Sequence, residues 1–107
     1  MDVILDRIVH MRIIDFYESA LNKYPSLDEY TISKKLVRIY DALEELGKYA
    51  TMYGKARLKS EWLEKGYQEC IIEDFHFAYR IYKDEFDQDY VYVHDACHSF
   101  LYYSDSL

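Results

Sequence analysis

The sequence predicts an α+β domain in which two N-terminal helices pack on one face of a small antiparallel sheet. In the first half of the chain, apolar residues recur at steps of three and four, which is the helical period. The second half consists of short runs rich in β-branched and aromatic residues, separated by polar breaks, which is typical of strands. Helices grouped before strands indicate an α+β architecture.

The first helix is expected to end at Pro25-Ser26, where the apolar period breaks. Its apolar face is predicted to comprise Ile4, Ile8, Met11, Ile14, Tyr17, Leu21 and Tyr24. Residues 3–5 are compatible with a short strand ahead of this helix, and so short a segment leaves that alternative open.

A second helix should follow, capped by Ser26 or Asp28, because either side-chain oxygen can accept a hydrogen bond from the first turn. Gly47 stands where a helix commonly ends. The predicted apolar face of this helix comprises Ile32, Leu36, Ile39, Tyr40, Leu43 and Leu46.

Three strands are predicted from the stretches YQECIIE, FHFAYRIY and YVYVHDAC. The charged segment KDEFDQD should connect the last two as a hairpin, and its acids discourage pairing between sheet edges. Residues 57–63 are a candidate for a further strand, with Trp62 as a large core or edge residue.

Length and composition indicate a single domain spanning residues 1–107, since a chain of this size with half its residues apolar can bury one core. No run approaches the roughly 18 apolar residues of a membrane helix. Asp2, Asp6 and Arg7 interrupt any signal-peptide core. Cys70 and Cys97 are then most simply reduced thiols, and we expect a cytoplasmic protein with no membrane partner.

The charge is unevenly distributed along an acidic chain of net charge −7. Such a balance argues against an unspecialised nucleic-acid binder, because phosphate contacts need Lys and Arg. Residues 46–60 nevertheless contain no acid, and Lys55, Arg57 and Lys59 fall there. This segment is either a basic strip that binds substrate or a plain solvated loop.

Three stretches near the end of the chain, KGYQECIIED (65–74), YRIYKDE (79–85) and CHSFLYY (97–103), resemble the RelE/ParE superfamily of bacterial type II toxin–antitoxin toxins, nearest to its YafQ-like branch. The resemblance implies a toxin that cleaves messenger RNA in the ribosome without metal or cofactor, and a cognate antitoxin protein as partner. His98 stands where the branch places a catalytic histidine, and Tyr102 takes the place of its C-terminal aromatic residue. Arg80 matches an arginine of the sheet that contacts phosphate, and His94 replaces an arginine.

The chain also departs from the family, since Ile71 and Glu73 stand where the RNA-cleaving toxins carry two lysines. This departure leaves two alternatives open. One is a ParE-like toxin that inhibits DNA gyrase by binding. The other is a decayed, non-catalytic interaction module on the same scaffold.

RNA cleavage without a metal requires a base, an acid and positive charge near the phosphate, and histidine and arginine supply these. On a regular strand, residues 76 and 80 share one face, and so do residues 94 and 98. We therefore expect His76, Arg80, His94 and His98 to converge on one surface, with Tyr102 stacking on a base. The alternatives are an ion-pairing role for Arg80 and packing roles for the histidines.

Two other chemistries are less well supported by the sequence. HDACH would place His94 and His98 on one helical face with Cys97 or Asp95, but on a strand Cys97 points away, so no metal site is predicted. Neither cysteine has a recognisable nucleophile signature, and Ser99 lacks the glycine-framed turn of many hydrolase nucleophiles.

Overall fold

The computed structural model describes residues 1–100 and contains two long helices and four strands. Within this range no helix is both long and apolar enough to cross a membrane. In chain order the elements are β1 (Asp2–Leu5), α1 (Arg7–Lys23), α2 (Glu29–Tyr49), the 3-10 turn η1 (Ala50–Met52), α3 (Ser60–Glu64), β2 (Gln68–Ile72), β3 (Phe75–Lys83) and β4 (Asp89–His98).

The four strands form one mixed sheet in the order β1-β4-β3-β2. The β2–β3 and β3–β4 pairs are antiparallel, whereas β1 lies parallel to β4 and pairs Asp2 with Tyr90 and Leu5 with Val93. The predicted α+β class is confirmed, and the short N-terminal strand is present. The sheet differs from the expected antiparallel one because β1 pairs parallel with β4, which the chain reaches only after α1, α2, α3, β2 and β3, and so long a connection permits parallel pairing.

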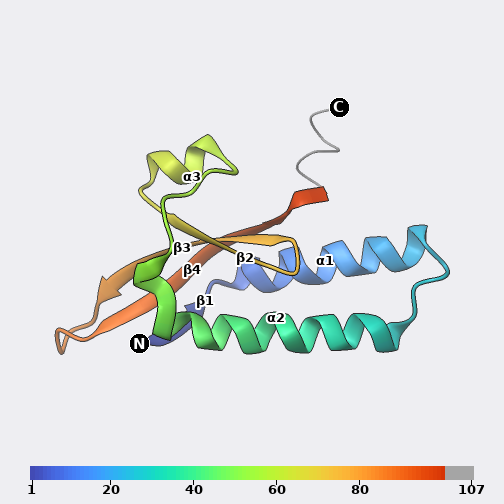
Figure 1. Ribbon diagram of the computed structural model, residues 1–107, viewed down its shortest axis with the longest axis horizontal. Coiled ribbons are helices and arrows are strands. Elements are labelled where there is room, and N and C mark those ends of the chain that lie inside the picture. Colours follow the sequence, from blue (N-terminus) through green and yellow to red (C-terminus); the bar gives the residue numbers. More distant parts are fainter. Residues whose placement is uncertain (101–107) are drawn as a thin grey trace.

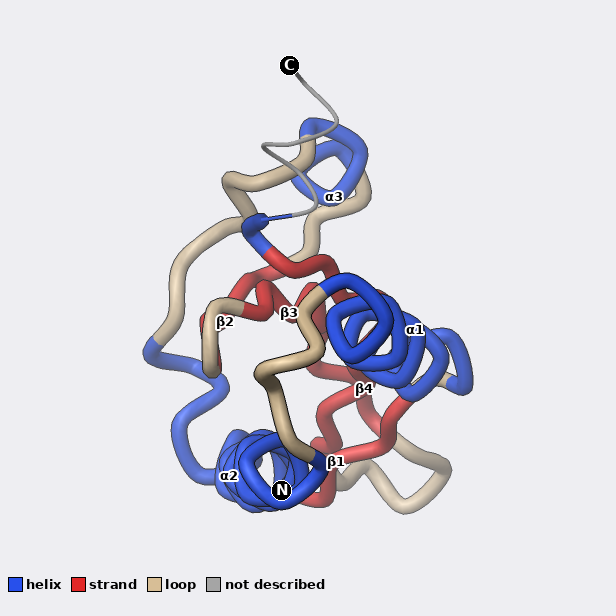
Figure 2. Tube along the Cα trace, turned by 90° about the vertical axis from the view of Figure 1, so that its right-hand side faces the viewer, coloured by secondary structure: helices blue, strands red, loops and turns tan. Residues whose placement is uncertain are grey.

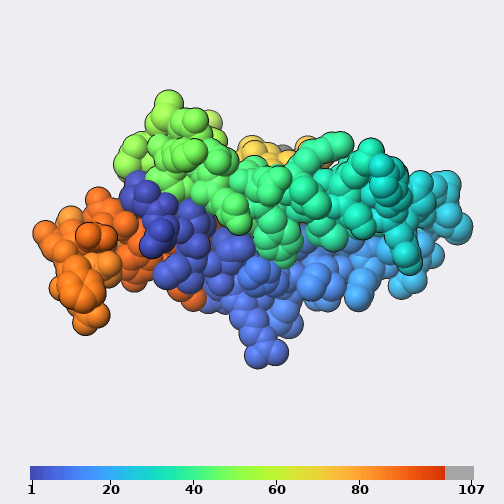
Figure 3. Space-filling model, turned by 90° about the horizontal axis from the view of Figure 1, so that it is seen from below, coloured from blue at the N-terminus to red at the C-terminus, as the bar shows by residue number. Residues whose placement is uncertain are grey.

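The helices divide between the two faces of this sheet (Figures 1 and 2). The long helices α1 and α2 cover one face, here called the helix side, and lie next to each other across it (Figure 3). The short helix α3 lies over the opposite face, here called the α3 side. The main core is on the helix side, and a smaller cluster of Ala56, Leu58, Trp62 and Ala78 fills the α3 side.

The predicted start and apolar face of α2 are confirmed. Asp28 caps the helix by accepting a hydrogen bond from the N–H of Thr31 at 2.6 Å. Four residues of the predicted face are buried, namely Ile32, Ile39, Leu43 and Leu46, and Leu36 and Tyr40 pack against them.

The predicted face of α1 is right at Tyr17, which is buried, and at Leu21, which packs against the core, but it is wrong in the first turns. Val9, Ile13 and Tyr17 are buried, while Met11 and Ile14 are 51% and 49% exposed. The reason is that Ile4 belongs to β1, so it cannot set the phase of the helix. The helix begins after Asp6, whose carboxylate accepts a hydrogen bond from the N–H of Ile8.

The candidate strand at residues 57–63 is also wrong, because Ser60–Glu64 form α3. Trp62 is only 2% exposed and anchors this helix on Ala78. Its Nε1–H donates to Asp95 of β4 at 3.4 Å. The large aromatic side chain is thus a core residue, but on the side of the sheet away from α1 and α2.

Gly47 lies inside α2, which continues to Tyr49, and so does not mark the end of the helix as expected. A Cβ atom at Gly47 would lie 1.9 Å from the carbonyl oxygen of Met1 and 3.3 Å from a methyl group of Val3. The glycine therefore allows the backbone of the N-terminal strand to approach the helix closely.

We expect Gly47→Ala to destabilise the fold by about 1–3 kcal/mol, the usual cost of overpacking, because backbone must move to admit the methyl group. This cost exceeds the gain of up to about 1 kcal/mol that alanine brings to a helix interior. Urea unfolding monitored by circular dichroism measures the difference. Gly54→Ala is the matched control, since a Cβ there has no neighbour within 4 Å. Equal stability of the two variants would contradict the prediction.

Candidate functional site

A β-bulge at His94 decides which side chains of β4 share a surface. The nine residues of β3 pair with nine of the ten residues of β4, and the register jumps from Tyr79–Val93 to Ala78–Asp95. His94 is the extra residue, so the alternation of side chains is reversed beyond it. Val91, Val93 and Ala96 all face the main core, although two are odd-numbered and one is even-numbered.

The bulge places His98 on the helix side of the sheet. Its imidazole stacks on Phe16 of α1 with ring centroids 3.8 Å apart, and it meets the edge of Phe75 at 4.9 Å. Arg80 belongs to the other face, because its strand neighbours Tyr79 and Ile81 pack into the main core. The predicted convergence of His98 with Arg80 is therefore wrong.

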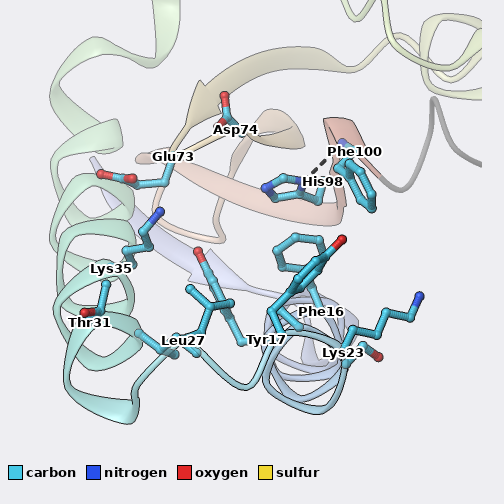
Figure 4. A pocket seen from close by; sticks show the side chains of 14 residues that line it. Phe16, Tyr17, Lys23, Leu27, Thr31, Lys35, Glu73, Asp74, His98 and Phe100 are labelled. Carbon is cyan, nitrogen blue, oxygen red and sulfur yellow. Dashed lines mark hydrogen bonds between the residues drawn. The ribbon is translucent and has the colours of Figure 1, made fainter.

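His98 lines a cavity of about 330 Å³ between α1, α2 and the turn that joins β2 to β3. This volume lies at the lower end of the range for small-molecule pockets. Figure 4 shows charged side chains at its rim, Lys23 and Lys35 from the helices and Glu73 and Asp74 from the turn. Its apolar wall includes Phe16, Leu27, Ile32 and Phe100.

The ring of His98 is held in a form that is a poor general base. Its Nδ1 accepts a hydrogen bond from the N–H of Phe100 at 3.1 Å, so the neutral ring carries its proton on Nε2. Burial lowers the pKa of His98 below its ordinary value of 6.5, and nearby Asp74 opposes this shift only in part. At neutral pH the group thus presents an N–H donor to the cavity.

The lowered pKa of His98 should make the fold less stable in mild acid. Below about pH 6.5 the unfolded chain takes up a proton at this residue more readily than the folded one, so the free energy of unfolding falls as pH falls. Urea titrations at pH 7.5 and 5.5 should show a smaller loss for His98→Gln than for the unsubstituted protein. An identical loss in both proteins would exclude this contribution.

On the α3 side, Arg80 and His94 share a surface with three tyrosines. The His94 ring stacks on Tyr67 at 4.5 Å and tilts against Tyr92 at 4.7 Å. Its Nε2 lies 2.7 Å from the hydroxyl of Tyr82, and the guanidinium of Arg80 lies over the ring of Tyr82 at 5.6 Å. We call this surface, made of Tyr67, Arg80, Tyr82, Tyr92 and His94, the Arg80–His94 face.

The electrostatics of this face keep His94 neutral. Burial lowers the pKa of His94, the positive charges of Lys65 and Arg80 lower it further, and Asp6 opposes them. Asp6 also accepts a hydrogen bond from the hydroxyl of Tyr92 at 2.7 Å, which fixes one wall of the face. A neutral imidazole beside an exposed arginine can accept a proton close to a bound anion.

The other predicted substrate-binding residues are spread along the α3 side. Lys59 lies over the ring of Trp62 at 5.4 Å, and the backbone N–H of Arg57 donates to Glu69. Lys55 is exposed beside β2, where it forms an isolated bridge with Gln68. His76 is hydrogen-bonded to Glu69 and Ser99, so it belongs to a separate group of side chains.

The remaining predictions concern Tyr102, a metal site and the cysteines. Tyr102 lies outside the described residues. Within residues 1–100, no cluster of three or more His, Cys, Asp or Glu side chains has the arrangement needed to hold a metal ion. Burial raises the pKa of the Cys70 thiol to about 12, so this side chain is a core residue and not a nucleophile.

Sequence reasoning missed three members of the Arg80–His94 face. Tyr82 follows Arg80 by two residues, so strand alternation alone could have placed it there. Tyr92 becomes evident only once β1 and Asp6 are known to border β4. Tyr67 precedes β2 and reaches His94 across the sheet, and no pattern in the sequence signals that contact.

Comparison with known proteins does not assign this chain to a family. It matches no model of a known protein family, and no curated protein matches it.

Proposed function

We propose that this chain is the toxin of a type II toxin–antitoxin module of the RelE/ParE kind, and that it cleaves messenger RNA in the ribosome. The observation that carries the proposal is the grouping of Arg80, His94 and three tyrosines on one face of the sheet. The order of elements, two long helices followed by three strands of the sheet on which they pack, agrees with what the resemblance implies.

The chemistry assigned to this face is intramolecular attack on a phosphodiester. His94 takes the proton of a ribose 2′-hydroxyl, and the oxygen attacks the neighbouring phosphorus. The bond between phosphorus and the 5′-oxygen then breaks, this oxygen takes a proton from water, and a 2′,3′-cyclic phosphate remains. For this step the ribose hydroxyl must replace the Tyr82 hydroxyl at Nε2 of His94.

The surrounding side chains supply charge and stacking. Arg80 is exposed and offers a planar set of donors to phosphate oxygens, and the ammonium group of Lys65 adds charge close to His94. Tyrosine rings can stack on unpaired bases, which is the usual mode of single-strand recognition. Arg80 and Lys65 bring two positive charges close to His94, against the one carboxylate of Asp6, although the whole chain carries −7, so binding should depend on this one face.

Controlled expression in a bacterial host tests the proposal. Growth should stop within one generation, and primer extension should reveal cuts in transcripts that are being translated but not in untranslated RNA. Co-expression of the cognate antitoxin, whose gene is expected beside this one, should restore growth. Unimpaired growth with soluble, folded protein would refute the assignment as a toxin.

A gyrase-inhibiting toxin is the second candidate. It is favoured by the separation of His98 from Arg80 onto opposite faces, which leaves one histidine beside the arginine, and by Ile71 and Glu73 in place of two lysines. A plasmid supercoiling assay with purified gyrase separates the candidates. Inhibition of supercoiling with intact transcripts supports this alternative. A protein that binds its antitoxin but shows neither activity is the non-catalytic module.

A further inference from the structure

A chain of three hydrogen-bonded side chains crosses the α3 side of the sheet, apart from the Arg80–His94 face. Oε2 of Glu69 lies 3.0 Å from Nδ1 of His76, and Nε2 of His76 lies 2.7 Å from the hydroxyl oxygen of Ser99. Carboxylate, imidazole and hydroxyl therefore follow one another in the order that activates a serine nucleophile.

Pairing of the strands brings Glu69 and Ser99 to opposite sides of His76. His76 of β3 is paired with Ile71 of β2 and with Cys97 of β4. Glu69 lies two residues before Ile71 and reaches His76 diagonally on the same face. Ser99 is the first residue beyond β4, and its N–H donates to the carbonyl oxygen of Asp74 at 2.9 Å, which holds it beside His76.

Two features orient the acid–base pair. The backbone N–H groups of Arg57 and Leu58 donate to Oε1 of Glu69 at 3.3 and 3.1 Å, which leaves Oε2 for His76. The side chains of His76 and Glu69 are only 13% and 9% exposed, so water competes little for their hydrogen bond. When Nδ1 of His76 donates to Glu69, Nε2 can accept the Ser99 hydroxyl proton once that hydroxyl turns away from the carbonyl oxygen of Asp74, to which it donates at 3.0 Å.

We propose that Glu69, His76 and Ser99 constitute a second reactive site, in which Ser99 accepts an acyl group from a small carboxylic ester. The Ser99 oxygen attacks the carbonyl carbon as His76 takes the hydroxyl proton. That proton passes to the departing alcohol when its bond to the carbonyl carbon breaks. Water, activated by the same imidazole, then releases the acid and restores the serine.

The groups around Ser99 determine how fast this residue is expected to be acylated. Its hydroxyl also lies 3.0 Å from the carbonyl oxygen of Asp74, which competes with His76 for the proton. The N–H groups of Ser99 and Phe100 are engaged by Asp74 and His98, so neither is available to stabilise an oxyanion. Because loss of one such donor slows acyl transfer by roughly 10²–10³-fold, acylation should be slow and visible as a covalent adduct before it is visible as turnover.

Labelling of the full-length protein with a fluorophosphonate probe tests the site, with the adduct mapped by peptide mass spectrometry. The adduct should form on Ser99, be absent from Ser99→Ala, and form at least tenfold more slowly in Glu69→Gln and His76→Gln. Ser33→Ala is the matched control, because Ser33 is exposed on α2, and it should label like the unsubstituted protein.

Two results would overturn the proposal. One is the absence of an adduct on Ser99 in the folded protein. The other is labelling of Ser99 that is unchanged in Glu69→Gln and His76→Gln, which would show that the carboxylate and imidazole only tether the end of β4. Thermal unfolding of each variant verifies that it is folded, and Glu69→Gln can keep both backbone hydrogen bonds. The outcome is independent of growth arrest and RNA cleavage, since none of the three residues belongs to the Arg80–His94 face.

Discussion

Replacing Arg80 with alanine is expected to slow cleavage of messenger RNA about a hundredfold or more and to abolish growth arrest. The guanidinium is exposed beside His94, where it would contact the phosphate that gains charge during attack. Removal of one preorganised charge or donor of this kind typically lowers a rate by about 10²–10³-fold. Cleavage should be measured in a cell-free translation reaction at equal concentrations of folded protein.

Arg38→Ala is the matched control for this experiment. It makes the same change of charge on α2, where Arg38 forms an exposed ion pair with Glu73 at 3.5 Å. This variant should retain activity. Equal loss in both variants would mean that net charge and not the position of Arg80 matters. His94→Ala should behave like Arg80→Ala, whereas a loss confined to His98→Ala would move the reacting centre to the helix side.

Phe77→Ala is expected to produce the largest loss of stability, about 3–5 kcal/mol, as is usual when a buried phenyl group is truncated. Phe77 is fully buried on the central strand β3, between Cys70 of β2 and Ala96 of β4. Its ring also packs on Phe75, with centroids 5.9 Å apart. Since small domains are stable by about 5–15 kcal/mol, the variant should be near the limit of folding.

Equilibrium unfolding in urea gives the free energy directly. Phe86→Ala is the control, because Phe86 is 76% exposed in the hairpin between β3 and β4 and its truncation should change stability by no more than about 0.5 kcal/mol. A Phe77→Ala protein as stable as Phe86→Ala would contradict the position of Phe77 in the core.

The helical half shows what periodicity can and cannot predict. The face of α2 was predictable because the helix is long, its start is fixed by Asp28, and its apolar residues keep one phase. In α1 the apolar residue Ile4 extended the pattern into what is really β1. A strand that runs directly into a helix supplies apolar residues of both periods, and sequence alone does not say where one period ends.

The predicted strand at residues 57–63 is wrong for a different reason. Residues 57–63 contain few turn signals and one large aromatic side chain, which resembles a short strand. Tertiary contacts decide the outcome, because Trp62 packs on Ala78 and reaches Asp95 only if its segment turns as α3. Because α3 has only five residues, its helix propensity is too weak to be recognised in the sequence.

Part of the candidate site followed from strand alternation and part did not. Alternation correctly grouped His76 with Arg80 on one face of β3. It failed for His98, because the bulge at His94 reverses the later part of β4 and carries no glycine or other sequence signal. The contacts of Ser99 depend on where β4 ends and on the turn between β2 and β3 that meets it there, which composition and spacing do not specify.

The order of strands in the sheet bears on how the protein is made. Among residues 1–100, β4 is the last strand in sequence order, yet it is paired on both sides and lies between β1 and β3. A nascent polypeptide that has not reached residue 89 therefore lacks β4, the shared partner of β1 and β3. The pairs from Asp2–Tyr90 to Leu5–Val93 also close a loop that spans most of the sequence. Such long-range closure slows folding and exposes apolar surface in the meantime. The domain should therefore acquire its native state only after β4 has been synthesised, and until then the nascent chain should be a substrate for molecular chaperones.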